Sequence, residues 1–192
     1  MRVLWVVFVC LLSAAGCYAP PSYQASSPSA GLPAVNSEPT TPTIKQDAYA
    51  TSINVEARGG EQTAGSTSQL FGLYGTINKK TGATVVYVQW AEIYAAPEWR
   101  FYSRASTNKG QELSMATVDR KVGNCHRTGN CIYTETYNIM MPAADLKAGA
   151  TSGVSFKIYG KRGDERVVNL PAPLIESFNA KMIEAAKLRT AS

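Results

Sequence analysis

The sequence predicts a mainly β protein, either an antiparallel β-sandwich or a partly open barrel, with one C-terminal amphipathic helix. From about residue 49, short runs of alternating polar and apolar residues recur between glycine-containing turns. These runs are rich in β-branched and aromatic residues, which favour strands. Near the C-terminus the apolar period changes to that of a helix. The alternative is an α+β fold in which the helix covers an open sheet face, because the pattern does not specify strand order.

The first three predicted strands include the clearest predicted hairpin, which is formed by residues 69–77 and 83–94. Residues 52–57 alternate and are expected to end at the polar, glycine-containing run 58–61. Residues 69–77 and 83–94 then flank a turn that ends in Gly82. Glycines within the first of these two strands indicate a bulge or a closely packed neighbour.

Further strands are expected at residues 99–105, 111–118, 131–140, 154–159 and 166–170. In the first of them, alternation places Trp99 and Phe101 on the buried face. The polar segments 119–129 and 142–149 are interpreted as loops, the second with at most one helical turn. The glycine-containing run 160–165 predicts a second hairpin turn.

The C-terminal helix is expected at residues 172–188. Leu174, Ile175, Phe178 and Met182 fall on one face of this helix, and prolines at 171 and 173 suit its start. We expect this apolar face to pack on the sheet. A helix that lies on a membrane or binds a partner would use the same face and is the alternative.

The N-terminus has the outline of an export signal. Arg2 precedes a short apolar run, and small residues lead into Cys17. Residues 12–17, Leu-Ser-Ala-Ala-Gly-Cys, resemble the lipobox of bacterial lipoprotein precursors, with Ala14 where leucine is usual. The resemblance implies that residues 1–16 are removed, that the Cys17 sulfur receives a diacylglyceryl group and that the new N-terminus is acylated. An ordinary cleaved signal peptide is the alternative.

The resemblance also implies a location. Tyr18 follows the cysteine instead of the aspartate that marks inner-membrane retention, which favours the outer membrane, with the domain in the periplasm or at the cell surface. Residues 17–48 are expected to form the lipidated cysteine and a disordered tether rich in Pro, Ser and Thr. Residues 49–192 are then a single β-rich extracytoplasmic domain.

Two cysteines, Cys125 and Cys131, remain once Cys10 leaves with the signal peptide and Cys17 carries lipid. In an exported protein such a pair is expected to form a disulfide. His126, the only histidine, lies beside Cys125, so a metal site here would have at most three ligands. Adjacent side chains point apart on extended backbone, so we expect no metal and no cofactor other than the covalent lipid.

The sequence gives little support for catalysis. A catalytic triad would depend on His126, which lies inside the expected disulfide loop. Glu92 and Glu98, on either side of a turn, are the one carboxylate pair considered for glycoside hydrolysis. The net charge of +5 comes from scattered Lys and Arg without a nucleic-acid-binding motif, so no nucleic-acid partner is expected.

The densest feature of the domain is a cluster of aromatic and arginine side chains. It is expected to fill the core, the alternative being an exposed platform for a glycan or a protein. The platform would use Trp90, Tyr94, Trp99, Arg100, Tyr102 and Arg104. The function expected from the sequence is a membrane-anchored, noncatalytic binding or structural module of the bacterial cell envelope with a protein partner. A glycan-binding or peptidoglycan-binding module and, less favoured, an envelope hydrolase are the alternatives.

Overall fold

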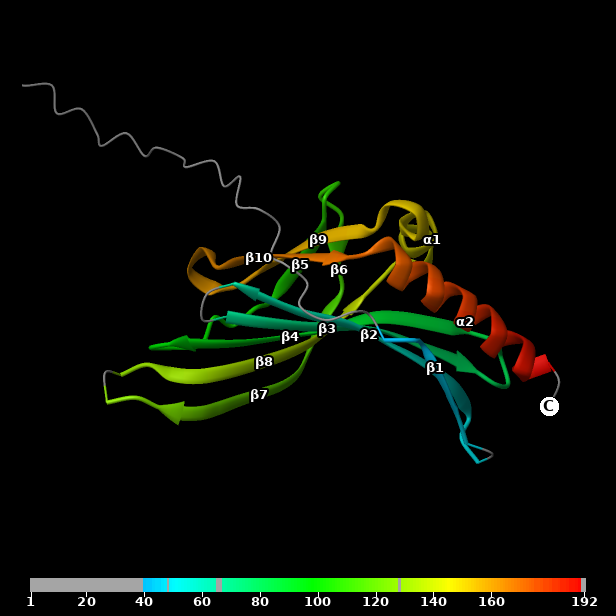
Figure 1. The fold of residues 1–192 in the computed structure, drawn as a ribbon, viewed down its shortest axis with the longest axis horizontal. Helices are drawn as coiled ribbons and strands as arrows, with labels where there is room; N and C mark the ends of the chain where they lie inside the picture. The colour runs from blue at the N-terminus through cyan, green and yellow to red at the C-terminus, as the bar shows by residue number, and fades with distance from the viewer. Residues whose placement is uncertain (1–39, 48, 65–66, 128, 191–192) are drawn as a thin grey trace, which may run out of the picture. The chain divides into compact units, whose positions relative to one another are not determined.

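The computed structural model describes residues 40–47, 49–64, 67–127 and 129–190. Its strands form two antiparallel sheets, one of six strands in the order β1-β2-β3-β4-β8-β7 and one of four in the order β10-β9-β5-β6 (Figure 1). Both sheets are open, and the chain ends in a long helix. The mainly β prediction with a C-terminal helix is therefore confirmed.

The larger sheet contains β1 (Thr43–Gln46), β2 (Ser52–Ala64), β3 (Thr67–Asn78), β4 (Thr84–Ala96), β7 (Met115–Cys125) and β8 (Cys131–Met140). The smaller sheet contains β5 (Arg104–Thr107), β6 (Glu112–Leu113), β9 (Val154–Tyr159) and β10 (Glu165–Leu170). The helices are α1 (Ala143–Ser152) and α2 (Ala172–Thr190), and a short 3-10 turn, Lys161–Gly163, joins β9 to β10.

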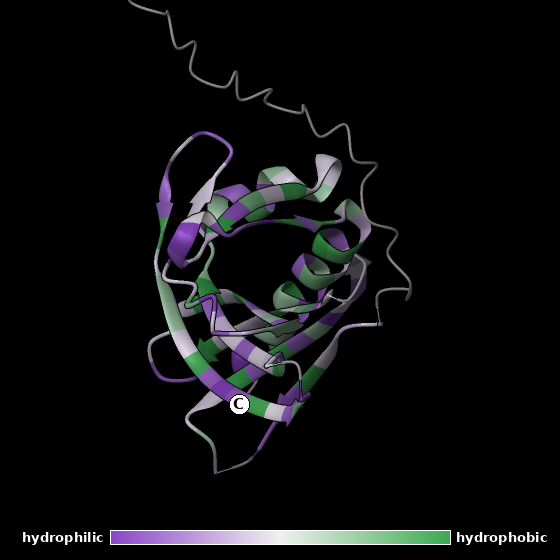
Figure 2. Ribbon diagram, turned by 90° about the vertical axis from the view of Figure 1, so that its left-hand side faces the viewer, coloured by the Kyte–Doolittle hydropathy of each residue, from purple (hydrophilic) through white to green (hydrophobic). Residues whose placement is uncertain are grey.

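The core lies between the sheets and under α2. Hydrophobic and hydrophilic residues alternate along the strands (Figure 2), and the inner strands β2, β3, β4 and β8 of the larger sheet turn an apolar face inward. Leu174, Ile175 and Phe178 on α2 are fully buried in the same cluster. The predicted packing of the helix on the sheet is thus confirmed.

Gly75 on β3 allows α2 to lie close to the sheet. A Cβ atom at this position would stand 2.3 Å from the sulfur of Met182 and 3.0 Å from the ring of Phe178. A larger side chain here would have to displace the Met182 side chain and crowd the Phe178 ring. The expectation of a closely packed neighbour in this strand is met here.

The larger sheet begins earlier in the chain than expected. Residues Thr43–Gln46 form β1 and pair with β2, so the expected end of the tether at residue 48 is wrong. Ile44 is β-branched and packs against the core, which explains why this part of a proline-rich segment joins an edge of the sheet.

β2 also continues past its expected end. A bulge between Arg58 and Gly60 carries the strand through the glycines to Ala64. A Cβ atom on Gly59 would overlap the ring of Phe71, and Gly60 has a φ of 107°, so these glycines shape the bulge instead of ending the strand.

Two segments expected as loops are regular. β7 runs through residues 119–125, because an edge strand with little burial on either face lacks the alternation that marks other strands. Residues Ala143–Ser152 form the ten-residue α1 instead of one turn.

The signal peptide, Cys17 and most of the expected tether lie outside the described residues. Within the described part of the chain, no helix combines the length and the apolar character needed to cross a bilayer.

Candidate functional site

The structure separates the six residues of the expected aromatic platform. Trp90, Tyr94 and Tyr102 are at most 1% exposed, so their rings lie in the interior and the exposed platform is wrong. Trp99 is half-buried against Tyr133, at 4.5 Å between ring centroids. Core packing, the preferred expectation for this cluster, is correct for the three buried rings.

The two arginines of the platform also have separate roles. Arg104 is exposed and places its guanidinium 4.4 Å from the centroid of the Tyr159 ring. The side chain of Arg100 is only 17% exposed and turns inward to a carboxylate. The six residues therefore do not form one binding surface.

Residues 99–103 do not form the strand that their alternation predicts; β5 begins at Arg104. Phe101 has a φ of 50°, in the left-handed region, and this reverses the expected faces. Tyr102 consequently points into the core, while Phe101 stays half-buried between the side chains of Arg120 and Lys161, at 5.1 and 4.8 Å from its ring centroid.

Two fully buried glutamates organise the space beneath this loop. Glu92 on β4 accepts a hydrogen bond of 2.8 Å from Arg100 Nη1, one of 2.6 Å from the Tyr102 hydroxyl and another from Arg166 Nε. Its partners come from the loop and from β10, so this carboxylate joins the two sheets. A buried carboxylate needs such paired charges and donors to offset its loss of water.

Glu135 on β8 is satisfied in the same way from a different direction. Its Oε1 accepts hydrogen bonds from the Tyr94 hydroxyl at 2.5 Å and from the backbone N–H groups of Arg100 and Phe101 at 3.2 and 3.1 Å. Successive N–H groups that converge on one anion form a nest, and the left-handed Phe101 makes that geometry possible. The Glu135 side chain is thus the anion that holds the loop in place.

The second carboxylate oxygen of Glu135, Oε2, has further hydrogen-bond donors. It accepts hydrogen bonds from Arg120 Nε at 3.3 Å and from the Tyr137 hydroxyl. We call the whole set the charged network. It consists of Glu92, Tyr94, Arg100, Tyr102, Arg120, Glu135, Tyr137 and Arg166.

The three tyrosines of the charged network are held in their neutral form. Burial, together with the adjacent Glu92 carboxylate, raises the pKa of Tyr102 well above its ordinary value. Burial and hydrogen bonds to Glu135 raise the pKa values of Tyr94 and Tyr137 in the same direction. Each hydroxyl donates to a carboxylate, which favours the protonated phenol.

Both carboxylates of the charged network are hydrogen-bonded within the chain. Each accepts hydrogen bonds from cationic and phenolic donors, which fix its orientation in the core. Glu98, the expected partner of Glu92, instead forms a surface ion pair with Arg162. The hypothetical carboxylate pair for glycoside hydrolysis therefore consists of one buried structural residue and one surface residue.

The expected disulfide is present. Cys125 ends β7 and Cys131 begins β8, and their bond joins the two strands beside the turn between them. His126 lies exposed in this turn and donates its backbone N–H to the carbonyl of Asn130 at 2.8 Å. Among the described residues, no group of three or more His, Cys, Asp or Glu side chains is arranged to hold a metal.

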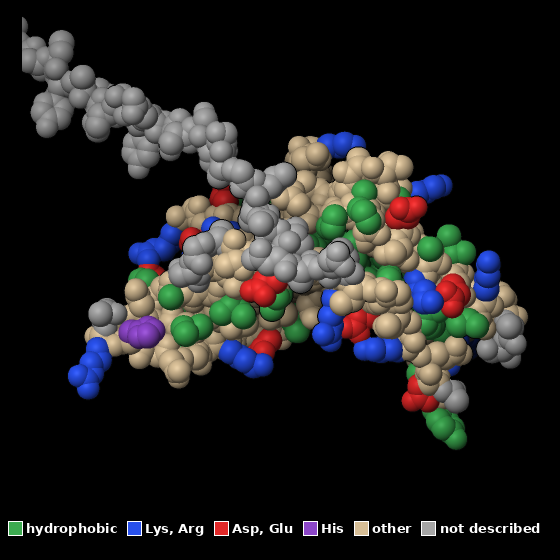
Figure 3. All heavy atoms as spheres, viewed as in Figure 1, with side chains coloured by type: hydrophobic (Ala, Val, Ile, Leu, Met, Phe, Trp, Pro, Cys, Tyr) green, Lys and Arg blue, Asp and Glu red, His purple; other side chains and the backbone are tan. Residues whose placement is uncertain are grey.

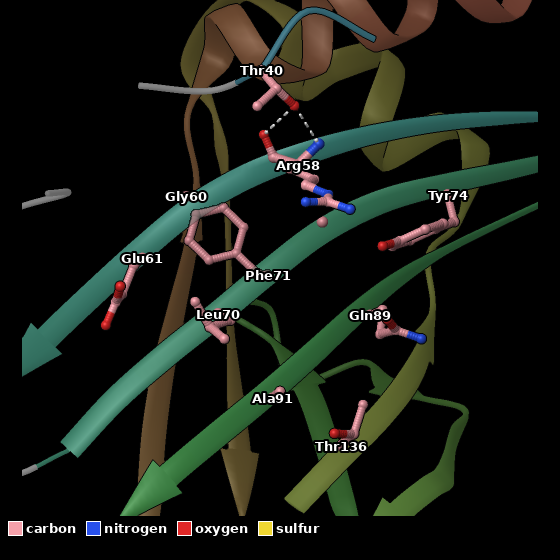
Figure 4. Close-up of a pocket in the computed structure, with 11 residues that line it drawn as sticks. Thr40, Arg58, Gly60, Glu61, Leu70, Phe71, Tyr74, Gln89, Ala91 and Thr136 are labelled. Atoms are coloured by element: carbon pink, nitrogen blue, oxygen red, sulfur yellow. Dashed lines mark hydrogen bonds between the residues drawn. The ribbon is translucent and has the colours of Figure 1, made fainter. Parts of the chain in front are cut away.

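A hollow lies in the outer face of the larger sheet, which points away from the smaller sheet (Figure 4). We call it the outer groove; its volume is about 480 Å³. It crosses β2, β3, β4 and β8 and is bounded by the segment before β1. Its lining consists of Thr40, Arg58, Gly60, Glu61, Leu70, Phe71, Gly72, Tyr74, Gln89, Ala91 and Thr136.

Small residues create the outer groove. In the strand register Gly72 lies opposite Arg58 on one side and Gln89 on the other, and Ala91 lies between Leu70 and Thr136. Glycine has no side chain and alanine has a short one, so the surface of the sheet at these positions lies below the long side chains of their neighbours. A depression lined by polar and apolar groups is the result.

Arg58 is the cation of the outer groove. Its backbone is fixed by Thr40, whose hydroxyl accepts the Arg58 N–H at 3.1 Å and whose own N–H donates to the Arg58 carbonyl at 3.0 Å. Its side chain remains 76% exposed, with Nε 3.5 Å from Glu56 Oε1. The exposed guanidinium thus extends from a fixed backbone over the groove, near Tyr74 and Gln89 (Figure 4).

Sequence reasoning missed both Glu135 and the outer groove. The pattern does contain a signal for the first, because Glu92 and Glu135 each share the inward face of a strand with aromatic residues. A charged residue at an inward position predicts buried partners of opposite charge. The groove depends on strand register, which the pattern does not provide.

Comparisons of the chain with known protein families, with curated proteins and with solved structures found no match.

Proposed function

We propose that this chain is a lipid-anchored, noncatalytic binding module of the bacterial cell envelope that acts through the outer groove. The lipobox resemblance of residues 12–17 supports the anchor and the envelope location. The disulfide between Cys125 and Cys131 is consistent with an oxidising compartment outside the cytoplasm.

One observation carries the proposal, namely the contrast between the charged network and the outer groove. The carboxylates Glu92 and Glu135 are fully buried and hydrogen-bonded to internal partners. The outer groove, by contrast, offers an exposed guanidinium, an amide and an aromatic ring in a hollow with a floor of small residues. Such a surface suits recognition of a ligand without chemical change.

The lining indicates the class of ligand. Arg58 suits carboxylate or phosphate oxygens, Gln89 and Thr136 can exchange hydrogen bonds with hydroxyl and amide groups, and Tyr74 offers a ring. Hydroxyl, amide and carboxylate groups occur together in the glycan strands and peptide stems of peptidoglycan. We therefore infer that peptidoglycan is the ligand. This replaces the disproved aromatic platform as the location of a glycan site.

The test is co-sedimentation of the full-length protein, solubilised from its membrane fraction, with purified peptidoglycan sacculi. Ala91→Leu fills the floor of the outer groove and is expected to reduce binding about tenfold or more, because the ligand loses its depression. Ala95→Leu is the matched control. It adds the same side chain to an exposed position of the same strand that lies outside the groove lining, and it should leave binding unchanged.

Equal binding by the two variants would reject the outer groove as the site, and no co-sedimentation of the unaltered protein would reject peptidoglycan. Release of soluble fragments from the sacculi would support the hydrolase alternative instead. The anchor is tested separately by intact mass: we expect residues 17–192 plus lipid, and a Cys17→Ser variant that is released or left unprocessed.

A further inference from the structure

The last strand of the larger sheet has an open edge. β7 pairs with β8 on one side and ends the strand order on the other, over eleven residues. Val118 and Val122 are 49% and 53% exposed on it. In Figure 3 hydrophobic side chains reach the surface in this part of the molecule, near the purple histidine of the β7–β8 turn. Long exposed edges with apolar residues favour pairing with another strand.

The conformation of this edge is fixed in advance. The disulfide joins the end of β7 to the start of β8, and the regular pairs from Asp119 to Val122 lie between two bulges. Its edge therefore has little conformational entropy to lose on pairing.

The charges of β7 complement those of a second copy in one antiparallel register. Directly opposite residues in an antiparallel pair lie on the same face of the sheet. When the two strands are copies of each other, the two-fold axis must therefore lie where one residue stands opposite its own copy. An axis at Asp119 or at Lys121 places that charge against itself. An axis at Arg120 places Asp119 opposite Lys121 at two points, within the regularly paired residues from Asp119 to Val122.

Arg120 itself is compatible with this arrangement. Its guanidinium bonds to Glu135 and Tyr137, both on β8, so it reaches away from the open edge and is neutralised within its own chain. The two copies of Arg120 therefore direct their charges apart from the axis. The side chains of Asp119 and Lys121 are 42% and 75% exposed and form an ion pair of 2.8 Å in the single chain, available for exchange with the partner.

We propose that β7 is a homodimer interface, in which two copies of this chain pair antiparallel about Arg120 and join their larger sheets into one continuous sheet. The outer groove stays open in this dimer, because its lining comes from β2, β3, β4 and β8 and from the segment before β1.

A charge-swap series on the full-length protein in detergent tests the register, with the mass of the complex measured by native mass spectrometry over a dilution series. Asp119→Lys and Lys121→Asp each place like charges opposite one another at two points. Each is expected to weaken the dimer about tenfold or more. The double variant Asp119→Lys/Lys121→Asp should restore it, and an equimolar mixture of the two single variants should form mixed dimers.

The series also separates this proposal from the preceding one. At a concentration at which the unaltered protein and all three variants are monomeric, the variants should unfold at the temperature of the unaltered protein and sediment with sacculi as it does, since both positions lie outside the outer groove. A monomer at every concentration of the unaltered chain would overturn the proposal and leave the edge for a strand of another protein. A dimer that all three variants retain would place the interface elsewhere.

Discussion

Under α2, the larger sheet is held by apolar side chains, whereas beneath the loop after β4 it is held by the charged network. The first region contains Phe178, Leu174 and Ile53 without an ionised partner among them. The second contains two carboxylates and three guanidinium groups inside or at the rim of the core. Burial of apolar groups is non-directional, whereas hydrogen bonds depend on angle. We infer that this fold uses charged groups where a loop needs a defined conformation.

The two regions should lose similar stability when a central side chain is truncated to alanine. Glu92→Ala leaves two arginines and a phenol without their acceptor and should lower the free energy of unfolding by about 3–5 kcal/mol. Phe178→Ala should cost a similar amount, about 3–5 kcal/mol, through the cavity that it leaves. Unfolding in urea, which is uncharged, measures both without screening the ion pairs.

The conservative variants then separate the two regions. Phe178→Leu should recover most of the loss, to within about 1.5 kcal/mol of the unaltered protein, because leucine is apolar and fills most of the cavity that alanine leaves. Glu92→Gln should recover much less, because the amide keeps the shape and loses the charge that two guanidinium groups need. Equal recovery at both positions would show that the charged network acts as ordinary packing.

The buried tyrosines of the charged network should contribute less to the free energy of unfolding, and their contribution should depend on pH. Tyr102→Phe removes a buried hydrogen bond to a carboxylate and should cost about 1.5–3 kcal/mol near neutral pH. Because the folded state raises the pKa of Tyr94, Tyr102 and Tyr137, their stabilisation is complete below the unfolded pKa of about 10 and is lost as pH rises toward the folded values.

Stability should therefore fall steadily above about pH 10, and the slope should be shallower in Tyr102→Phe. Tyr49→Phe is the control, since Tyr49 is 96% exposed and should change neither the stability nor the slope. Urea unfolding at a series of alkaline pH values gives both quantities. An unchanged slope in the Tyr102 variant would mean that the alkaline loss arises from other groups.

The same contrast explains how much of the structure was predictable. Alternation and helical period are local, so residues 69–77, 131–140 and 172–188 were predicted close to β3, β8 and α2. The strand expected at residues 99–105 failed, because a backbone nest around Glu135 fixes Phe101 in a left-handed conformation. That carboxylate is 34 residues further along the chain, and the local pattern does not contain it.

The candidate site divides in the same way. The pairing of Cys125 with Cys131 was predictable, because it followed from the cysteine count together with the expectation of export. The burial of Trp90 was expected from its strand, but its neighbour Glu92 was not, because partners such as Arg166 come from another sheet. The outer groove requires Gly72 and Ala91 to be neighbours across β3 and β4, and only the register brings them together.

The smallest predicted effect tests whether burial or charge decides the importance of a glutamate. Glu98 lies in the loop that follows β4 and pairs with Arg162, but its side chain is 52% exposed, whereas that of Glu92 is fully buried. Glu98→Ala should lower the free energy of unfolding by only about 0.2–1 kcal/mol, because water solvates both ions and salt screens them. The loss should shrink further in high salt, while that of Glu92→Ala persists. If the two variants lost similar stability, the loop would depend on its surface charges as much as on its interior ones, and the division between the two kinds of charge would have to be abandoned.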